Sequence, residues 1–373
     1  MKKDDHPPRR GESIPITDIG VSVYTIPTDF PESDGTIDWG HTTMILVTVS
    51  AGGKQGMGYT YADPSVGAII GKTLKPLLIG KDAMQIPDIN QTLVRAIRNN
   101  GTCGLAMMGV SAVDIAAWDL KGKLLDLPVC SLLGRARDKM AIYGSGGFTS
   151  YSDNRTRDQF QAWAAQGISH FKMKIGREPQ KDVGRVKAAR EAIGRDASLY
   201  VDANGAYSAR QATKFAHAFI GFDVTWFEEP VSSDDLPGLR FVREHSPAGC
   251  AIAAGEYGYH LPYFQAVLRA GAVDILQADA TRCGGITNFL LAAGLAAAHQ
   301  IPFSSHCAPA IHLQAALAAP GFFIAEYFHD HSRIESMFFD GLPQPKKGCL
   351  EPDLSRPGLG FDFKAADAEK HKL

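Results

Sequence analysis

The chain has 373 residues and a formal net charge of −2, with no long basic run. This near balance of charge excludes the electrostatic pattern of a nucleic-acid-binding protein. No apolar stretch approaches the length of a membrane span, and the polar start lacks the apolar region of a signal peptide, so we expect a cytoplasmic protein without a membrane partner.

The first part of the chain predicts a tail followed by a small mixed domain. Residues 1–13 are polar and rich in proline, which predicts a disordered tail. Residues 14–135 mix alternating apolar stretches with helical patterns and predict an α+β domain. Its expected elements are strands over 16–26, 44–49 and 56–61, a long loop over 27–43, and helices over 65–78, 87–98 and 106–124, the last buried along one face.

Eight short apolar stretches follow, and a helical segment comes after most of them. Strands that alternate with helices form a parallel sheet, and eight of them predict an α/β fold with a (β/α) barrel over residues 136–330. After Glu326 the alternation is expected to stop, and residues 331–373 are expected to return to the first domain. The stretches are 140–143, 171–175, 199–204, 225–228, 251–256, 273–279, 301–306 and 322–326.

Three acidic residues stand at the ends of consecutive predicted strands: Asp202, Glu228 and Glu256. Strand ends converge at one rim of a barrel, where three bare carboxylates would repel one another. An all-oxygen ligand set with room for water and substrate favours Mg²⁺ over Zn²⁺. Three unrelated surface acids are the alternative. Glu229 adjoins Glu228, so its side chain lies on the opposite face of the strand, and it is given a supporting role. Asn204 lies on the same face as Asp202 and is expected to bind substrate.

Four further residues complete the predicted rim. Side chains alternate along a strand, and the outer face of a barrel strand is apolar, so Lys172 and Lys174 should point inward. The alternative is a half-exposed strand with two solvated lysines. Asp279 and His306 end neighbouring strands and are expected to form a hydrogen-bonded pair. Lys174 and His306 would then face each other, with Glu326 between them as a hydrogen-bond donor if protonated.

Three other features suggest weaker hypotheses. His329-Asp330-His331 is a rival metal cluster, but a solvated loop is the favoured interpretation. Gly144 to Gly147 resembles a phosphate loop but lacks the lysine and the helix of one. The six cysteines have no CxxC spacing, which is typical of reduced, mostly buried thiols.

A metal ion beside a lysine base suits removal of a proton from the carbon next to a carboxylate, with the charge of the enediolate stabilised by cations. Lys172 is expected to lower the pKa of Lys174 toward ~7–8, where a general base works best. A facing His306 would protonate either a β-hydroxyl, giving dehydration, or the opposite face of the carbon, giving racemisation or epimerisation. A protein that binds sugar acids without turnover is the non-enzymatic alternative, but binding needs no facing bases.

Over nearly its whole length the sequence resembles the enolase superfamily, and within it the mandelate racemase subgroup. A Lys or His base with Mg²⁺ is already known for this superfamily. Each motif is modest, and the specificity lies in their order and strand placement. The motifs are residues 111–123 with Leu132-Leu133-Gly134, Lys172-Met173-Lys174, Asp202-Ala203-Asn204-Gly205, residues 226–230, Gly255-Glu256, Asp279 with Gly284-Gly285, Ser304-Ser305-His306, and Glu326.

The resemblance implies a modified (β/α)7β TIM-type barrel with an α+β capping domain, and a homo-oligomer. It implies a mobile capping loop over residues 27–43 that closes the site. It implies Mg²⁺ on Asp202, Glu228 and Glu256, acid/base roles for Lys174, His306 and Asp279, and substrate contacts from Lys172 and Glu326.

The capping loop is polar, and Trp39 and His41 within it are expected to contact the substrate. A polyhydroxylated acid would find more hydrogen bonds there than an aryl acid. We therefore predict a small carboxylate substrate, an acid sugar (aldonate or aldarate), which is dehydrated to a 2-keto-3-deoxy acid. Racemisation or epimerisation of a 2-hydroxy acid is the alternative.

Overall fold

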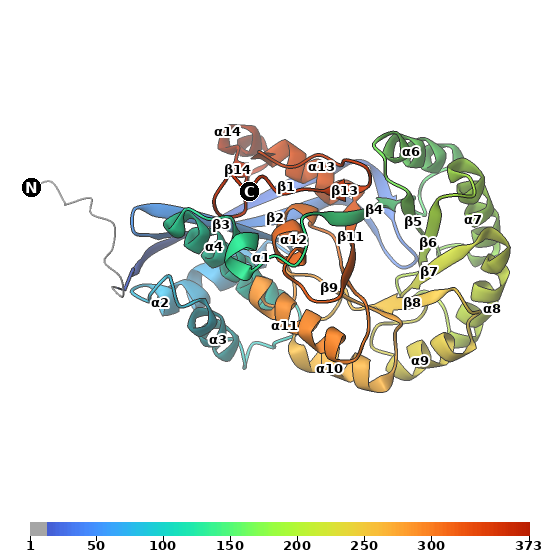
Figure 1. Ribbon diagram of the computed structural model, residues 1–373, viewed down its shortest axis with the longest axis horizontal. Helices are drawn as coiled ribbons and strands as arrows, with labels where there is room; N and C mark the ends of the chain where they lie inside the picture. The colour runs from blue at the N-terminus through green and yellow to red at the C-terminus, as the bar shows by residue number, and fades with distance from the viewer. Residues whose placement is uncertain (1–12) are drawn as a thin grey trace, which may run out of the picture.

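The computed structural model describes residues 13–373, so the predicted tail lies outside the described residues except for Ser13. Two units are visible in Figure 1: an antiparallel sheet with its helices, and a ring of helices around a barrel of strands. The antiparallel sheet has the order β1-β2-β3, with β1 Ile16–Ser33, β2 Asp38–Ala51 and β3 Lys54–Tyr61.

The predicted loop over 27–43 is wrong, because β1 continues to Ser33 and β2 begins at Asp38. The hairpin has an irregular register between Pro27 and Glu32, where proline supplies no N–H to the ladder. This irregularity interrupts the alternation that marks a strand in the sequence. What was expected to be a loop is therefore a long two-stranded arm, which we call the capping hairpin (residues 27–43).

The tip of the capping hairpin is fixed to the barrel. Asp34 Oδ1 accepts hydrogen bonds from the backbone N–H groups of Thr36 at 2.6 Å and Ile37 at 2.8 Å, which hold the tight turn. Thr149, after the first barrel strand, donates its N–H to Ser33 O at 2.9 Å. The hairpin therefore lies closed over the barrel.

The expected helices of the first domain are present. The stretch over 65–78 is divided into α1 Ser65–Ile69, a π-helical turn η1 Ile70–Leu74 and α2 Lys75–Leu78. It is followed by α3 Ile86–Ala96, α4 Leu105–Leu125 and α5 Val129–Leu133. The expected buried face of α4 is confirmed at Val110, Val113, Ala117 and Leu120, and the helix is buried on other sides as well, because it packs between β2 and β3 on one side and α11 on the other. A Cβ atom on Gly58 of β3 would lie 2.4 Å from Ala112 O, so glycine is needed for this close approach.

A buried carboxylate joins the two units. Asp114 of α4 accepts hydrogen bonds from Asn90 Nδ2 at 2.8 Å and from Thr287 N and Oγ1 at 3.1 and 2.6 Å. Burial raises the pKa of Asp114 to about 6, and the hydrogen bonds from Thr287 and Asn90 oppose that rise. Thr287 belongs to barrel helix α11 Gly285–Ala298, so the contact fixes the first domain on the barrel.

Asp114→Ala is expected to lower the free energy of unfolding by about 2–4 kcal/mol, because one buried and two half-buried donors lose their acceptor. Urea denaturation followed by circular dichroism measures this change. Asp88→Ala on the exposed side of α3 is the matched control and should cost less than about 1 kcal/mol. Equal midpoints for the two variants would contradict the assigned role of Asp114.

All eight predicted barrel strands are present and form one parallel sheet in chain order, closed by pairing of β11 with β4. Tyr143, Tyr200 and Trp226 fill the barrel interior, whereas the larger apolar cluster lies between strands and helices. The strands are β4 Met140–Gly146, β5 His170–Lys174, β6 Ser198–Asp202, β7 Val224–Glu228, β8 Ala251–Ala254, β9 Ile275–Ala278, β10 Phe303–Ser305 and β11 Phe322–Phe328. The intervening helices are α6 Asp153–Ala165, α7 Pro179–Ile193, α8 Ala209–Phe219 with η2 Ile220–Phe222, α9 Leu236–His245, α10 Leu261–Ala270, α11 and α12 Pro309–Ala316.

The expected end of the alternation after Glu326 is wrong, since α13 His329–Phe338 follows β11 and contains the proposed domain boundary at residue 330. The last segment forms β12 Phe339–Asp340, β13 Cys349–Leu350, β14 Asp362–Phe363, α14 Ala365–Ala368 and η3 Glu369–His371. It pairs β13 with barrel strand β4 and also returns to the first domain, where Leu373 N donates to Val23 O at 2.9 Å. None of the described helices is long and apolar enough to span a membrane.

Candidate active site

The three predicted acids converge on the barrel rim. Asp202 and Glu228 are the last residues of β6 and β7 and are direct partners in the parallel register, and Glu256 lies just after β8. All three are buried, and each offers a carboxylate oxygen within 4.8 Å of the others. We call Asp202, Glu228 and Glu256 the carboxylate trio.

Both lysines of β5 point into the barrel and are buried, 0% exposed for Lys172 and 5% for Lys174, so the half-exposed alternative does not apply. Lys172 Nζ lies 2.5 Å from Glu228 Oε1 and 2.8 Å from Glu326 Oε1. Lys174 Nζ lies 2.6 Å from Asp202 Oδ2. The cross-strand register places Lys174 directly beside Asp202, whereas Lys172 lies closest to Glu228 and is 3.4 Å from Asp202 Oδ2.

The expected low pKa of Lys174 is wrong for this arrangement of side chains. Burial lowers the pKa of Lys174, but the adjoining Asp202 carboxylate raises it more, and Lys172 lowers it only as a smaller effect. The pKa of Lys172 is likewise raised, because Glu228 and Glu326 outweigh the lowering caused by burial. Repulsion between the two lysines is therefore a smaller effect than attraction to their carboxylate partners, which the sequence does not reveal.

Glu326 accepts hydrogen bonds through both carboxylate oxygens. Oε1 faces Lys172, and Oε2 accepts the backbone N–H of Cys307 at 2.9 Å. Burial raises the pKa of Glu326, but the charges of Lys172 and His306 lower it by more than burial raises it. The net pKa of Glu326 is therefore well below its usual range. The prediction that a protonated Glu326 donates a hydrogen bond is therefore wrong.

His306 and Asp279 form the expected pair, with His306 Nδ1 2.8 Å from Asp279 Oδ2. Thr281 donates its N–H and its hydroxyl to the other Asp279 oxygen, each at 2.7 Å. Burial raises the pKa of Asp279, but the hydrogen bond and charge of His306 lower it below its usual range. His306 Nε2 is 3.5 Å from Glu256 Oε2, so the imidazole reaches the trio from the side of β8.

A cavity of about 490 Å³, which we call the reaction cavity, joins these groups to the capping hairpin. Lys174, Asn204 and His306 line it from the barrel, and Trp39 and His41 line it from the hairpin. Trp39 Nε1 already donates to Glu32 Oε2 at 2.8 Å, so Trp39 offers its ring rather than its N–H to the cavity. Of the other residues that the sequence proposed for the site, Glu256 also lines the cavity. Lys172, Asp202, Glu228, Asp279 and Glu326 do not line it, but the contacts above join each of them to the same cluster.

Comparison with known families gives the identity of the fold. A family model described as mandelate racemase / muconate lactonizing enzyme, N-terminal domain matches residues 24–134, and one described as enolase C-terminal domain-like matches residues 155–368. This chain belongs to the mandelate racemase/muconate lactonizing enzyme family of the enolase superfamily.

Curated relatives in the family cover almost the whole chain. A 3,6-anhydro-alpha-L-galactonate cycloisomerase of Streptomyces coelicolor is 34% identical over 93% of this chain and 97% of its own length. A D-galactarolactone cycloisomerase of Agrobacterium fabrum is 32% identical over 90% and 93%. An arabinonate dehydratase of Saccharolobus solfataricus is 28% identical over 93% and 90%. These relatives differ in reaction but share sugar-acid substrates in their names.

Solved structures of the family have folds similar to that of this chain. A mandelate racemase/muconate lactonizing enzyme-like protein from Rubrobacter xylanophilus has 51% identity and a TM-score of 0.94, covering 96% of this chain and 100% of its own. A racemase from Streptomyces coelicolor with bound magnesium has 30% identity and a TM-score of 0.91, over 96% and 100%. L-talarate/galactarate dehydratase from Salmonella typhimurium, liganded with Mg and L-lyxarohydroxamate, has 27% identity and a TM-score of 0.88, over 99% and 96%.

The residues of this family member fit a magnesium ion. The trio is all-oxygen and buried, and Glu256 Oε2 is a buried oxygen with no hydrogen-bond partner among the described residues. Burial and the neighbouring Asp202 carboxylate raise the pKa of Glu228 well above its usual range. A hard divalent cation satisfies such a set of oxygens better than the lysines alone can.

Two lining residues were missed in the sequence. Cys307 Sγ lies 3.1 Å from His306 Nε2, and burial and Glu326 raise the pKa of the thiol, so it is a neutral neighbour of the imidazole. Arg282 donates from Nη1 to Glu256 O at 3.1 Å and lies 3.5 Å from Glu256 Oε1. The only sequence signal was their position just after the predicted site residues His306 and Asp279.

The rival cluster His329-Asp330-His331 does not form a solvated loop. It begins helix α13, and Asp330 and His331 are buried. His331 stacks on Tyr61 with ring centroids 3.6 Å apart, and burial lowers its pKa to about 3. Of the six cysteines, five are buried as expected and all six are free, whereas Cys103 is exposed.

Proposed function

We propose that this protein is a Mg²⁺-dependent dehydratase of an acid sugar (an aldonate or aldarate) that yields a 2-keto-3-deoxy acid. The observation that carries the proposal is the placement of Lys174 and His306. Both line the reaction cavity, and they adjoin different members of the carboxylate trio, Asp202 and Glu256. A substrate carboxylate held at the trio would therefore have a proton carrier on each side.

The Mg²⁺ ion, when bound by Asp202, Glu228 and Glu256, would polarise the substrate carboxylate and make the α-proton more acidic. Lys174 would remove that proton, leaving an enediolate whose charge Lys172 stabilises. To act as a base Lys174 must be neutral. Sharing of the Asp202 charge with a divalent cation would weaken the main effect that raises the pKa of Lys174, while burial and Lys172 both lower that pKa.

His306 would complete the reaction by giving a proton to the β-hydroxyl. The β-carbon–oxygen bond breaks with its electron pair on oxygen, water leaves, and the resulting enol takes up a proton at the β-carbon to become the 2-keto acid. Asp279 holds the ring of His306 through Nδ1 and keeps Nε2 toward the cavity. The fully engaged Glu326 would hold Lys172 in place.

Cycloisomerisation of a cyclic sugar acid is the second candidate, and the two cycloisomerase relatives favour it. The chemistry differs only in the leaving group. A ring oxygen on the β-carbon leaves without separating from the molecule, so the product is an isomer. Racemisation or epimerisation, for which His306 would return a proton to carbon, is an alternative supported by the racemase from Streptomyces coelicolor. A homo-oligomer remains part of the proposal, on the family resemblance.

A library of aldonates, aldarates and their cyclic forms, incubated with the protein and Mg²⁺, tests the proposal. We expect a 2-keto product whose mass is one water below that of the substrate. The keto group is detected by conversion of the product to its semicarbazone. A 2-keto product of unchanged mass would support the cycloisomerase. Recovery of an epimer without keto acid would contradict both and support the racemase.

A further inference from the structure

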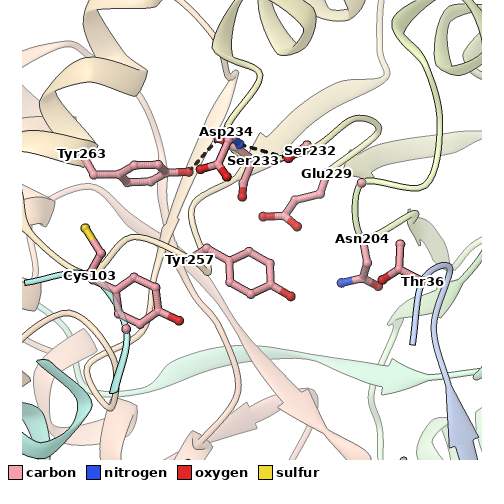
Figure 2. Close-up of a pocket in the computed structure, with 12 residues that line it drawn as sticks. Thr36, Cys103, Asn204, Glu229, Ser232, Ser233, Asp234, Tyr257 and Tyr263 are labelled. Carbon is pink, nitrogen blue, oxygen red and sulfur yellow. Dashed lines mark hydrogen bonds between the residues drawn. The ribbon is translucent and has the colours of Figure 1, made fainter. Parts of the chain in front are cut away.

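A second cavity, of about 590 Å³, adjoins the reaction cavity, and Asn204 and Tyr257 line both. We call it the tail pocket. Its walls are the loops that follow β6, β7 and β8, together with the turn of the capping hairpin and the loop before α4 (Figure 2). Its lining residues are Thr36, Cys103, Gly104, Asn204, Gly205, Glu229, Ser232, Ser233, Asp234, Tyr257, Tyr259 and Tyr263.

The tail pocket begins close to the proposed reaction. Asn204 N donates to Asp202 Oδ1 at 2.9 Å, Glu229 directly follows Glu228, and Tyr257 directly follows Glu256. Each of these residues is thus one or two positions from a member of the trio but lines the neighbouring cavity. A chain of carbons that starts at the trio therefore reaches the tail pocket by passing Asn204 and Tyr257.

The chemistry of the lining suits hydroxyl groups. Glu229 is 1% exposed, and its Oε1 is a buried oxygen without a hydrogen-bond partner among the described residues, as is Asn204 Oδ1. In Figure 2 the Glu229 carboxyl group points into the open space beside the Tyr257 ring. These unpartnered polar atoms need hydrogen-bond partners, and an aromatic ring offers its electron-rich face to C–H groups. Polyhydroxylated carbon chains supply both.

The lining does not suit a second carboxylate. Among the residues that the structure describes around the tail pocket there is no lysine, arginine or histidine, while Asp234 contributes a carboxylate. Burial and the neighbouring Glu256 raise the pKa of the Glu229 carboxyl group well above its usual range. The Arg282 guanidinium lies 5.3 Å from the centre of the Tyr257 ring and already donates to Glu256. A distal carboxylate would meet Asp234 without a compensating cation, which costs binding free energy.

The reaction cavity offers no better place for a distal carboxylate. Lys174 and His306 serve the reacting end, and burial lowers the pKa of His331 to about 3, which leaves it neutral. Arg282 lies 3.5 Å from Glu256 Oε1 and 3.7 Å from Asp279 Oδ2, so its charge is already paired. His41 is the last basic residue of that described lining, and Asp34 and Asp63 lie in the same wall. The negative charge of a diacid would therefore find one carboxylate site, at the trio.

We propose that the tail pocket binds the uncharged, polyhydroxylated end of the substrate, so that the substrate is a monocarboxylic sugar acid (an aldonate) and not a dicarboxylic one. This inference rests on the proposed function and narrows its substrate class. Asp234 acts as a specificity residue that repels a terminal carboxylate.

Matched pairs of sugar acids test the inference on the full-length protein with Mg²⁺. Each pair has the same stereochemistry and differs only in a terminal CH₂OH or carboxylate. We expect kcat/KM for the aldonate of the best pair to exceed that for the aldarate by at least about 30-fold, because the terminal charge is uncompensated. An aldarate that is used as well as its aldonate would overturn the inference while leaving the dehydratase intact.

Two variants add the missing cation to exposed positions of the tail pocket, Asp234→Arg and Ser232→Lys. Asp234→Arg should shift the aldonate-to-aldarate ratio of kcat/KM at least about 10-fold toward the aldarate. Asp196→Arg makes the same charge change at an exposed site before β6, at the opposite end of the barrel, and should leave the ratio unchanged. An unchanged ratio in both pocket variants would overturn the inference.

Measurement of sugar-acid binding distinguishes failure of the dehydratase assignment from failure of the inference about the tail pocket. If no sugar acid of either class reacts, the dehydratase assignment fails, and calorimetric titration of the same pairs in the presence of Mg²⁺ decides the tail pocket alone. Tighter binding of the aldonate would support the pocket, and tighter or equal binding of the aldarate would overturn it.

Discussion

Lys174→Ala and His306→Ala are each expected to abolish detectable formation of the keto acid, with kcat reduced by about 10²–10⁴-fold or more. Lys174 is the base in the proposal and His306 the acid, so neither can replace the other. Binding of Mg²⁺ should persist in both variants, because the trio supplies its ligands. Steady-state kinetics and calorimetric titration with Mg²⁺ measure the two effects.

Lys181→Ala, on the exposed surface of α7, is the matched lysine control and should retain wild-type turnover. Near-normal turnover in either Lys174→Ala or His306→Ala would remove that residue from the chemistry. Loss of Mg²⁺ binding in Lys174→Ala would instead show that the lysine serves the metal site, since its Nζ lies 2.6 Å from Asp202 Oδ2.

Removal of the metal is expected to have an effect of the same size. Treatment with EDTA should reduce turnover to roughly background, and Mg²⁺ should restore it, because the substrate carboxylate and the trio would otherwise repel each other. Glu256→Gln should weaken Mg²⁺ binding at least about 10-fold by removing one charged ligand. The measurements are activity against free Mg²⁺ concentration and titration of the variant. Full turnover by a protein shown by elemental analysis to be free of metal would contradict the metal assignment.

Most of the barrel was predictable because its signal is local. Most of the eight predicted strands are apolar stretches that end in a polar or ionisable residue, and strand order in a (β/α) barrel follows chain order. That rule alone placed Asp202, Glu228 and Glu256 side by side before any register was known. The parity of a strand likewise predicted that Lys172 and Lys174 share the inner face.

What the sequence could not give depends on contacts between distant segments. The two arms of the capping hairpin are strands because β1 pairs with β2, although the prolines and polar residues of this segment are typical of a loop. The pKa of Lys174 is set by Asp202, 28 positions away, and the roles of Arg282 and Cys307 appear only once loops meet at the rim. The tail pocket combines five separate segments, none of which carries a motif.

We propose that a magnesium ion and two opposed proton carriers share one cavity. The test is exchange of the α-proton of a sugar acid with solvent, followed by proton NMR in D₂O. With Mg²⁺ present we expect at least one aldonate to lose its α-proton signal in a time that depends on enzyme concentration, and Lys174→Ala to leave that signal intact. Binding of an aldonate without exchange, or exchange that persists unchanged in Lys174→Ala, would contradict the account.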